Sequence, residues 1–184
     1  MDFMHDGLIN GSPFRSFNVI DDFNREALNI TLDTCLTSQR VIRELEKVIE
    51  WRGKPERIRV DNGPEFIAQA MESWSESKGI TLKFIQKGKP HQNGYVERFN
   101  RSYREEVLDS FAFNNIKEAQ TLSNAWIWVY NNERPHSSLN YLTPAAFLLK
   151  YGKLHNPLKP TEEFPTFQQD INNTWNSLLL SATN

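Results

Sequence analysis

The α/β character of the chain is set by residues 57–85, RIRVDNGPEFIAQAMESWSESKGITLKFI. Residues 57–60 alternate between polar and apolar side chains, which predicts a short strand, and they run into the turn-forming residues 61–64. Residues 65–78 place apolar side chains at helical spacing and are followed by a glycine, which predicts a helix. Residues 80–85 predict a second strand. A strand, a helix and a strand in this order favour an α/β fold.

Upstream of this stretch, the pattern predicts a meander of three strands followed by a helix. The strand predictions cover residues 2–9, 14–20 and 27–32, and short turns rich in Asn, Asp and Gly separate them. The helix is expected between Thr37, a good N-cap residue, and Gly53, which favours helix termination.

Downstream, helices are expected over residues 93–108 and 117–132, with a shorter one ending near residue 151. We therefore predict one domain over residues 1–150 and a C-terminal tail over 151–184. Three meander strands, then strands that alternate with helices, favour a five-stranded mixed sheet flanked by helices. The ribonuclease-H-like fold has this order of elements.

Composition excludes several classes of protein. The chain has 184 residues, 39% of them hydrophobic, with a formal net charge of −2 and one cysteine. No apolar run is long enough to span a membrane, and the first residues lack the pattern of a secretory signal. One cysteine excludes an internal disulfide framework and a cysteine-based zinc site. Because the net charge is close to zero, a site for nucleic acid would have to be a local basic patch.

Three acidic residues make the best candidate site for a metal ion. Asp61 follows a predicted strand, Glu97 lies in a predicted helix after thirty-five intervening residues, and Asp2 lies in the first strand. Carboxylates that are held together repel one another, and a hard divalent cation such as Mg²⁺ or Mn²⁺ relieves that repulsion. Each acid also has an ordinary interpretation as a turn or surface residue. Asp6 would share a strand face with Asp2, and spacing does not choose between them.

Basic and amide side chains gather around the helix that carries Glu97. Lysines precede it, amides stand at its start, and arginines lie along it; such groups contact nucleic-acid phosphates. The candidates for DNA contact are Lys87, Lys89, Gln92, Asn93, Arg98 and Arg101. The alternative is that the arginines form salt bridges within the helix.

Five segments of the chain resemble the integrase core of bacterial insertion-sequence transposases, the product of a second, frameshift-joined reading frame that is related to retroviral integrases. The segments are DFMHDGL, NVIDDFNRE, RVDNGPEF, FIQKGKPHQNGYVERFNRSYREEVLD and YNNERPHSSLNYLTPAAF, within residues 2–148. The resemblance implies that Asp2, Asp61 and Glu97 are the catalytic, metal-binding acids, and it selects Asp2 over Asp6. It implies no chemical role for the NNERPH segment.

The resemblance further implies DNA transposition: metal-dependent cleavage at the ends of an element, then transfer of the freed 3′-OH into target DNA. The implied partners are both DNAs, further copies of the chain on DNA, and an upstream DNA-recognition region or partner reading-frame product. We expect a cytoplasmic, nucleoid-associated protein. Asp2 is the second residue, whereas the family has more strand before this acid, so we expect an N-terminally truncated core. The alternative is an impaired remnant that acts only as a DNA-binding or oligomerisation module.

Overall fold

The computed structural model describes residues 1–86, 88 and 90–152. The chain divides into two units, Met1–Tyr151 and Gly152–Asn184. Only Gly152 of the second unit is among the described residues, so almost all of the predicted tail lies outside them. No helix in the described part of the chain is long and apolar enough to cross a membrane.

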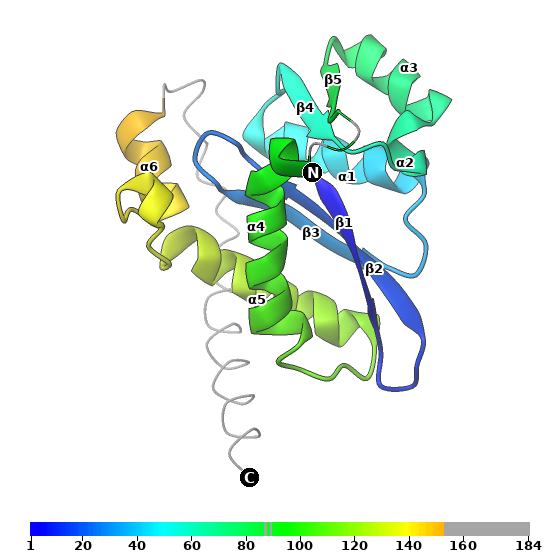
Figure 1. Ribbon diagram of the computed structural model, residues 1–184, viewed down its shortest axis with the longest axis vertical. Coiled ribbons are helices and arrows are strands. Elements are labelled where there is room, and N and C mark those ends of the chain that lie inside the picture. Colours follow the sequence, from blue (N-terminus) through cyan, green and yellow to red (C-terminus); the bar gives the residue numbers. More distant parts are fainter. Residues whose placement is uncertain (87, 89, 153–184) are drawn as a thin grey trace. The chain divides into compact units, whose positions relative to one another are not determined.

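The N-terminal sheet is the predicted antiparallel meander (Figure 1). It consists of β1 (Asp2–Gly7), β2 (Pro13–Ile20) and β3 (Ala27–Asp33), with β2 in the middle. The register places Asp2 opposite Asn18. Since paired residues project to the same side of a sheet, these two side chains share one face at the beginning of β1.

The stretch that sets the α/β class forms a parallel pair of strands with helices between them. The strands are β4 (Arg57–Val60) and β5 (Thr81–Phe84). The prediction of a single helix over 65–78 is wrong in one respect. The structure divides this stretch into α2 (Pro64–Ile67) and α3 (Gln69–Lys78). Ala68 between them is extended, with φ −64° and ψ 140°, and its carbonyl accepts the first hydrogen bonds of α3.

The five predicted strands are present, but they do not form one five-stranded sheet. Their hydrogen bonds make a three-stranded sheet and a separate two-stranded sheet. A hydrogen bond of 2.9 Å from the Met1 amino group to the Arg59 carbonyl links β1 to β4. A ladder needs backbone groups on both strands at successive positions, and β1 is next to β4 only at its first residue.

The apolar core lies between the sheets and helix α1 (Ser38–Arg52). Thr37 caps α1 as predicted, since its side chain accepts a hydrogen bond from the Arg40 amide. Side chains from β2, α1, β4, α2 and α3 meet in this core: the most buried are Phe17, Val41, Val60, Phe66 and Met71.

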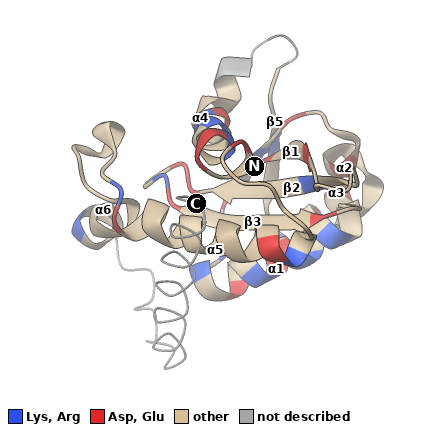
Figure 2. Cartoon of the chain, turned by 90° about the horizontal axis from the view of Figure 1, so that it is seen from below, with Lys and Arg blue, Asp and Glu red and all other residues tan. Residues whose placement is uncertain are grey.

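Helix α4 (Gly94–Tyr103) covers the opposite face of the N-terminal sheet from α1 (Figure 2). A short 3₁₀ turn (Pro90–Asn93) precedes it, and a π-helical turn, η2 (Arg104–Leu108), continues it. The predicted helix over 93–108 therefore changes its winding at residue 104. The apolar stripe expected on it is buried, and its members are Val96, Phe99, Tyr103 and Val107. Phe99 and Tyr103 pack against Trp126 of the long helix α5 (Ile116–Asn132).

The NNERPH segment fastens the end of α5 to the rest of the domain. The Asn131 amide accepts a hydrogen bond from the Ala27 N–H at 2.8 Å and donates one to the Ala27 carbonyl at 2.9 Å. Arg134 donates to both carboxylate oxygens of Glu106 in η2. The His136 ring packs edge-on against Tyr130. These contacts give the segment a structural role.

A 3₁₀ turn, η3 (Ser137–Leu139), and helix α6 (Pro144–Tyr151) complete the described unit. The amide of Asn24, in the turn after β2, donates to the Pro144 carbonyl at 3.2 Å and so holds α6 against that turn. Phe23 and Phe147 pack edge-on at the same contact.

We expect Asn131→Ala to lower the free energy of unfolding by about 2 kcal/mol, because it leaves two backbone groups of β3 without partners. Asn132→Ala is the matched control, since that exposed amide bonds only to Trp128 in its own helix; we expect a loss below about 0.5 kcal/mol. Urea unfolding of both variants measures the difference. Equal losses would contradict the role given to Asn131.

Candidate active site

Asp61 lies directly after β4, and a tight turn sets its side chain. Its Oδ1 accepts a hydrogen bond of 2.9 Å from the Gly63 N–H. The Asn62 amide donates to the Ile85 carbonyl at 3.1 Å, which ties this turn to the end of β5. A Cβ added to Gly63 would lie 3.0 Å from Asp61 Oδ1. A larger residue at position 63 would therefore crowd the carboxylate and force it to shift.

Asp2 is half-buried at the beginning of β1, and hydrogen bonds reach both of its carboxylate oxygens. Oδ1 accepts from the N–H of Phe3 and Oδ2 accepts from the Asn100 amide, each at 2.8 Å. Asn100 lies on α4, three residues after Glu97, so it is on a neighbouring part of the same helix. The strand of Asp2 and the helix of Glu97 are thus joined directly.

A second buried amide supports this contact. Asn18, in the middle of β2, donates to Asn100 Oδ1 at 2.8 Å. Asn18 is 0% exposed and Asn100 is 8% exposed. Neither residue was among the candidates from the sequence. Asn18 stands between Phe17 and the apolar residues Val19 and Ile20. This position was the signal that could have identified it, because a buried amide needs hydrogen-bond partners.

The pKa of Asp2 depends on the other two candidate acids. Burial raises the pKa of Asp2 above its ordinary value, and the negative charges of Asp61 and Glu97 raise it further. Hydrogen bonding to Phe3 opposes this shift. Glu97 lies in the first turn of α4, and its side chain is exposed. Asp61 and Glu97 are therefore near enough to Asp2 to oppose its ionisation.

Asp6 has a different environment from Asp2. Its carboxylate forms an ion pair of 3.2 Å with Arg104, which also donates to the His5 carbonyl at 2.7 Å. The sequence did not decide between Asp2 and Asp6; in the structure, Asp6 is neutralised by a cation whereas Asp2 is surrounded by amides and further acids.

The donor set of Asp2, Asp61 and Glu97 suits a hard divalent cation, because all three offer carboxylate oxygens and their repulsion would be relieved by positive charge. Within the described residues, no three acidic, histidine or cysteine side chains already stand close enough to hold a metal ion together. Binding of Mg²⁺ or Mn²⁺ by these three residues therefore stays a prediction.

The predicted DNA-contact residues fall into three groups. Lys87 and Lys89 lie outside the described residues. Gln92 bonds to Gln86, and Asn93 is buried at 5% exposure. Arg98 and Arg101 are exposed on α4. Neither arginine forms an ion pair within the described part of the chain, so the alternative interpretation, salt bridges within the helix, is not seen there.

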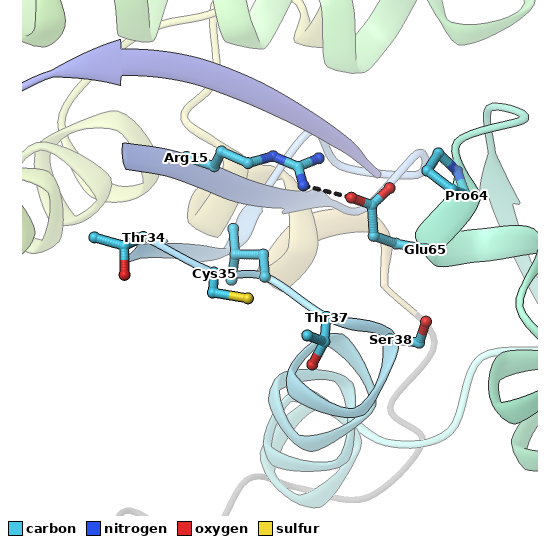
Figure 3. Close-up of a pocket in the computed structure, with 8 residues that line it drawn as sticks. Arg15, Thr34, Cys35, Thr37, Ser38, Pro64 and Glu65 are labelled. Carbon is cyan, nitrogen blue, oxygen red and sulfur yellow. Dashed lines mark hydrogen bonds and ion pairs between the residues drawn. The ribbon is translucent and has the colours of Figure 1, made fainter. Parts of the chain in front are cut away.

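A separate shallow cavity of about 400 Å³ lies on the other face of the sheet, between β2, the start of α1 and α2 (Figure 3). Arg15 and Glu65 form an ion pair along its wall. None of the three candidate acids lines it.

Comparison with known proteins connects this arrangement to insertion elements. Residues 1–90 and residues 78–144 each match a family described as integrase core domain. A 31.7 kDa protein of insertion element IS407 from Burkholderia multivorans is 42% identical over 151 residues, which cover 82% of this chain and 54% of that protein. A 39.2 kDa protein of IS476 from Xanthomonas euvesicatoria is 38% identical, covering 82% and 44%. The chain spans about half the length of these relatives.

Solved structures share the fold. A chain of the simian T-cell lymphotropic virus intasome superposes with a TM-score of 0.67 at 21% identity, over 88% of this chain and 56% of that chain. The HTLV-2 integrase catalytic core domain in complex with magnesium superposes with a TM-score of 0.61 at 21% identity, over 78% and 90%. The predicted ribonuclease-H-like α/β fold is confirmed, apart from the continuity of its sheet.

We expect Gly63→Ala to weaken Mn²⁺ binding by about tenfold, because the added methyl group displaces the Asp61 carboxylate. Calorimetric titration with Mn²⁺ measures the effect, and thermal unfolding checks the fold. Gly7→Ala is the matched control, since a Cβ there would meet only the Ser12 carbonyl, at an ordinary 3.9 Å. Equal affinities in the two variants would refute the role of Gly63.

We expect Asp61→Asn to stabilise the metal-free protein at neutral pH by a fraction of a kcal/mol, at most about 1 kcal/mol. The raised pKa of Asp2 means that its ionised form destabilises the fold, and removal of the Asp61 charge reduces that cost. The gain should shrink as the pH falls towards the pKa of Asp2, where the carboxyl is protonated. Urea unfolding across this pH range tests the expectation. A gain that does not depend on pH would contradict it.

Proposed function

Because the chain belongs to the integrase core domain family of insertion elements, we propose that it is the catalytic core of a DNA transposase. The observation that carries this proposal is the hydrogen bond from Asn100 to Asp2, which sets the helix of Glu97 against the strand of Asp2. Asp61 completes the group of acids, and its charge raises the pKa of Asp2.

Cleavage and strand transfer are two substitutions of the same kind at phosphorus. In the first, a water oxygen attacks a phosphodiester at the end of the element, and the bond from phosphorus to the 3′ oxygen breaks to leave a free 3′-OH. In the second, this 3′-OH attacks a phosphodiester of target DNA and a new 3′-OH leaves. Neither step needs a covalent bond between protein and DNA.

The three acids would hold divalent cations, which activate the attacking oxygen and stabilise the leaving oxygen when bound. The chain's own contribution is to position these acids. The turn at Gly63 orients Asp61, and the amides of Asn18 and Asn100 orient Asp2. Glu97 remains exposed on its helix, where it can reach a ligand.

We extend assembly to this chain from its neighbours and take its location from the sequence-based expectation. The HTLV-2 core domain is described in trimeric and dimeric forms, and the simian virus chain belongs to an intasome. We propose that several copies of this chain act together on DNA at the nucleoid. Recognition of the element ends would require an additional region or a partner reading-frame product.

The test is nicking of a supercoiled plasmid with Mg²⁺. We expect the wild-type chain to nick, and Asp2→Asn, Asp61→Asn and Glu97→Gln each to reduce the rate by at least about 100-fold. Asp6→Asn is the matched control on the same strand face, and we expect it to retain nicking. Donor and target oligonucleotides then distinguish strand transfer from cleavage alone.

The opposite outcome has a clear interpretation. If the wild-type chain does not nick while it binds DNA, and if neither Asp61→Asn nor a chelator changes that binding, the chain is a DNA-binding or oligomerisation module rather than an enzyme. If Asp6→Asn abolishes nicking and Asp2→Asn does not, the assignment of the first acid is wrong.

A further inference from the structure

Arg25 occupies an unusual position in the turn between β2 and β3. Its backbone has φ +62°, in the left-handed region that glycine and asparagine prefer. Hydrogen bonds from Arg25 to Asp21 and from Asp21 to Glu26 close the turn. A residue with a long side chain is strained there, and such strain is concentrated at functional sites. Backbone hydrogen bonds account for the turn itself. They do not account for a long, charged side chain at its strained position.

Among the residues that the structure describes, no carboxylate pairs with the guanidinium group of Arg25. Seven of the described arginines are not fully exposed, and the other six each form an ion pair with Asp or Glu: Arg15, Arg40, Arg52, Arg59, Arg104 and Arg134. Arg25 Nε and Nη1 are buried and have no hydrogen-bond partner within the described part of the chain. An unpaired, partly buried cation is costly unless a ligand completes its contacts.

Acidic residues beside Arg25 are already paired with other arginines. Arg52 binds Asp21 at 2.9 Å and Glu26 at 3.2 Å. Arg59 binds Asp22 at 3.0 Å. Arg52 and Arg59 thus neutralise the carboxylates of the turn, and none of these carboxylates neutralises the charge of Arg25.

An aromatic ring on α4 holds this charge in place. The Arg25 guanidinium lies 3.4 Å from the centroid of the Tyr95 ring, and Tyr95 is 46% exposed. Arg98 lies one turn further along α4 and is also exposed. Tyr95 and Arg98 share one flank of the helix, whereas Glu97 and Asn100 lie towards the other flank.

Arg25 and Arg98 both act on the ring of Tyr130, near the end of α5. Burial raises the pKa of Tyr130 to about 12, and the charges of Arg134, Arg25 and Arg98 act in the opposite direction. Glu106 acts on the same ring, and Arg134 already neutralises it. Arg25 and Arg98, in contrast, form no ion pair within the part of the chain that the structure describes.

We propose that Arg25, stacked on Tyr95, and Arg98 form a contact site for backbone phosphates of DNA, next to the helix that carries Glu97. The site rests on the proposed function, and it adds two residues, Arg25 and Tyr95, to the expected DNA contacts. Arginine suits phosphate because its planar group carries several N–H donors around one positive charge. Nε and Nη1 of Arg25 are buried, so Nη2 is the donor that would reach a phosphate, and the Tyr95 ring holds the group in place.

Binding of the full chain to a short, fluorescently labelled DNA duplex tests the site, in EDTA so that no cleavage occurs. We expect Arg25→Gln to weaken binding by about fivefold and to reduce the slope of log K against log salt by about 1, as expected for one lost phosphate contact. Tyr95→Leu should weaken binding in the same direction. Arg43→Gln is the matched control, because it removes one positive charge, an exposed one, from α1 on the other face, and we expect it to change neither quantity.

A second replacement separates binding from folding. Arg25→Gly removes the side chain and relieves the left-handed strain, so we expect an unchanged or higher melting temperature with the same loss of DNA affinity. The inference is overturned if Arg25→Gly binds like the wild type, if Arg25→Gln and Arg43→Gln lose affinity equally, or if affinity falls only together with the melting temperature.

The plasmid assay keeps this inference separate from the proposed function. Nicking by the wild-type chain, with no effect of Arg25→Gln on DNA binding, would refute the phosphate site and leave the transposase assignment intact. Loss of DNA affinity in Arg25→Gln, with no nicking by the wild-type chain, would support the site and count against catalysis.

Discussion

The hydrogen bonds that join Asn18, Asn100 and Asp2 are the constraint on which the candidate site depends. They run from the middle of the sheet to helix α4 and back to the first residue of β1. Both amides are buried, so neither can exchange its protein partner for water without cost. A carboxylate at the extreme end of a strand would otherwise depend on the Phe3 N–H alone. The acids therefore owe their proximity to the contact between a helix and a sheet.

The arginines of the domain fall into two groups. The net charge of the chain is −2, but some arginines bind acids inside the domain, and others form no ion pair within the described residues. Arg52 and Arg104 secure the β2–β3 turn and β1. The helix itself then presents a carboxylate, Glu97, and a cation, Arg98, on successive residues. The proposed metal site and the proposed phosphate site thus lie on different flanks of one helix.

Much of the fold could be predicted, because strands and helices follow from the local period of apolar residues. The meander, the parallel strand pair and the buried stripe of α4 were found in this way. The break at Ala68 was missed, since alanine favours helix and only its packing makes it extended. The single five-stranded sheet was also wrong: periodicity identifies strands, whereas the pairing of β1 with β4 depends on which backbone groups lie opposite one another.

The candidate site, like the fold, could be predicted only in part. The sequence by itself determined the types and spacing of the acids, the glycine turn after Asp61 and, through its resemblance, the family. Only the tertiary structure decided that Asp6 is paired with Arg104, that the Asn100 amide bonds to Asp2, and that no acid among the described residues pairs with Arg25. The reason is physical. A residue's type states what it can bond to, but the partner it finds depends on segments as far apart as residues 2 and 100, which only the folded chain brings together.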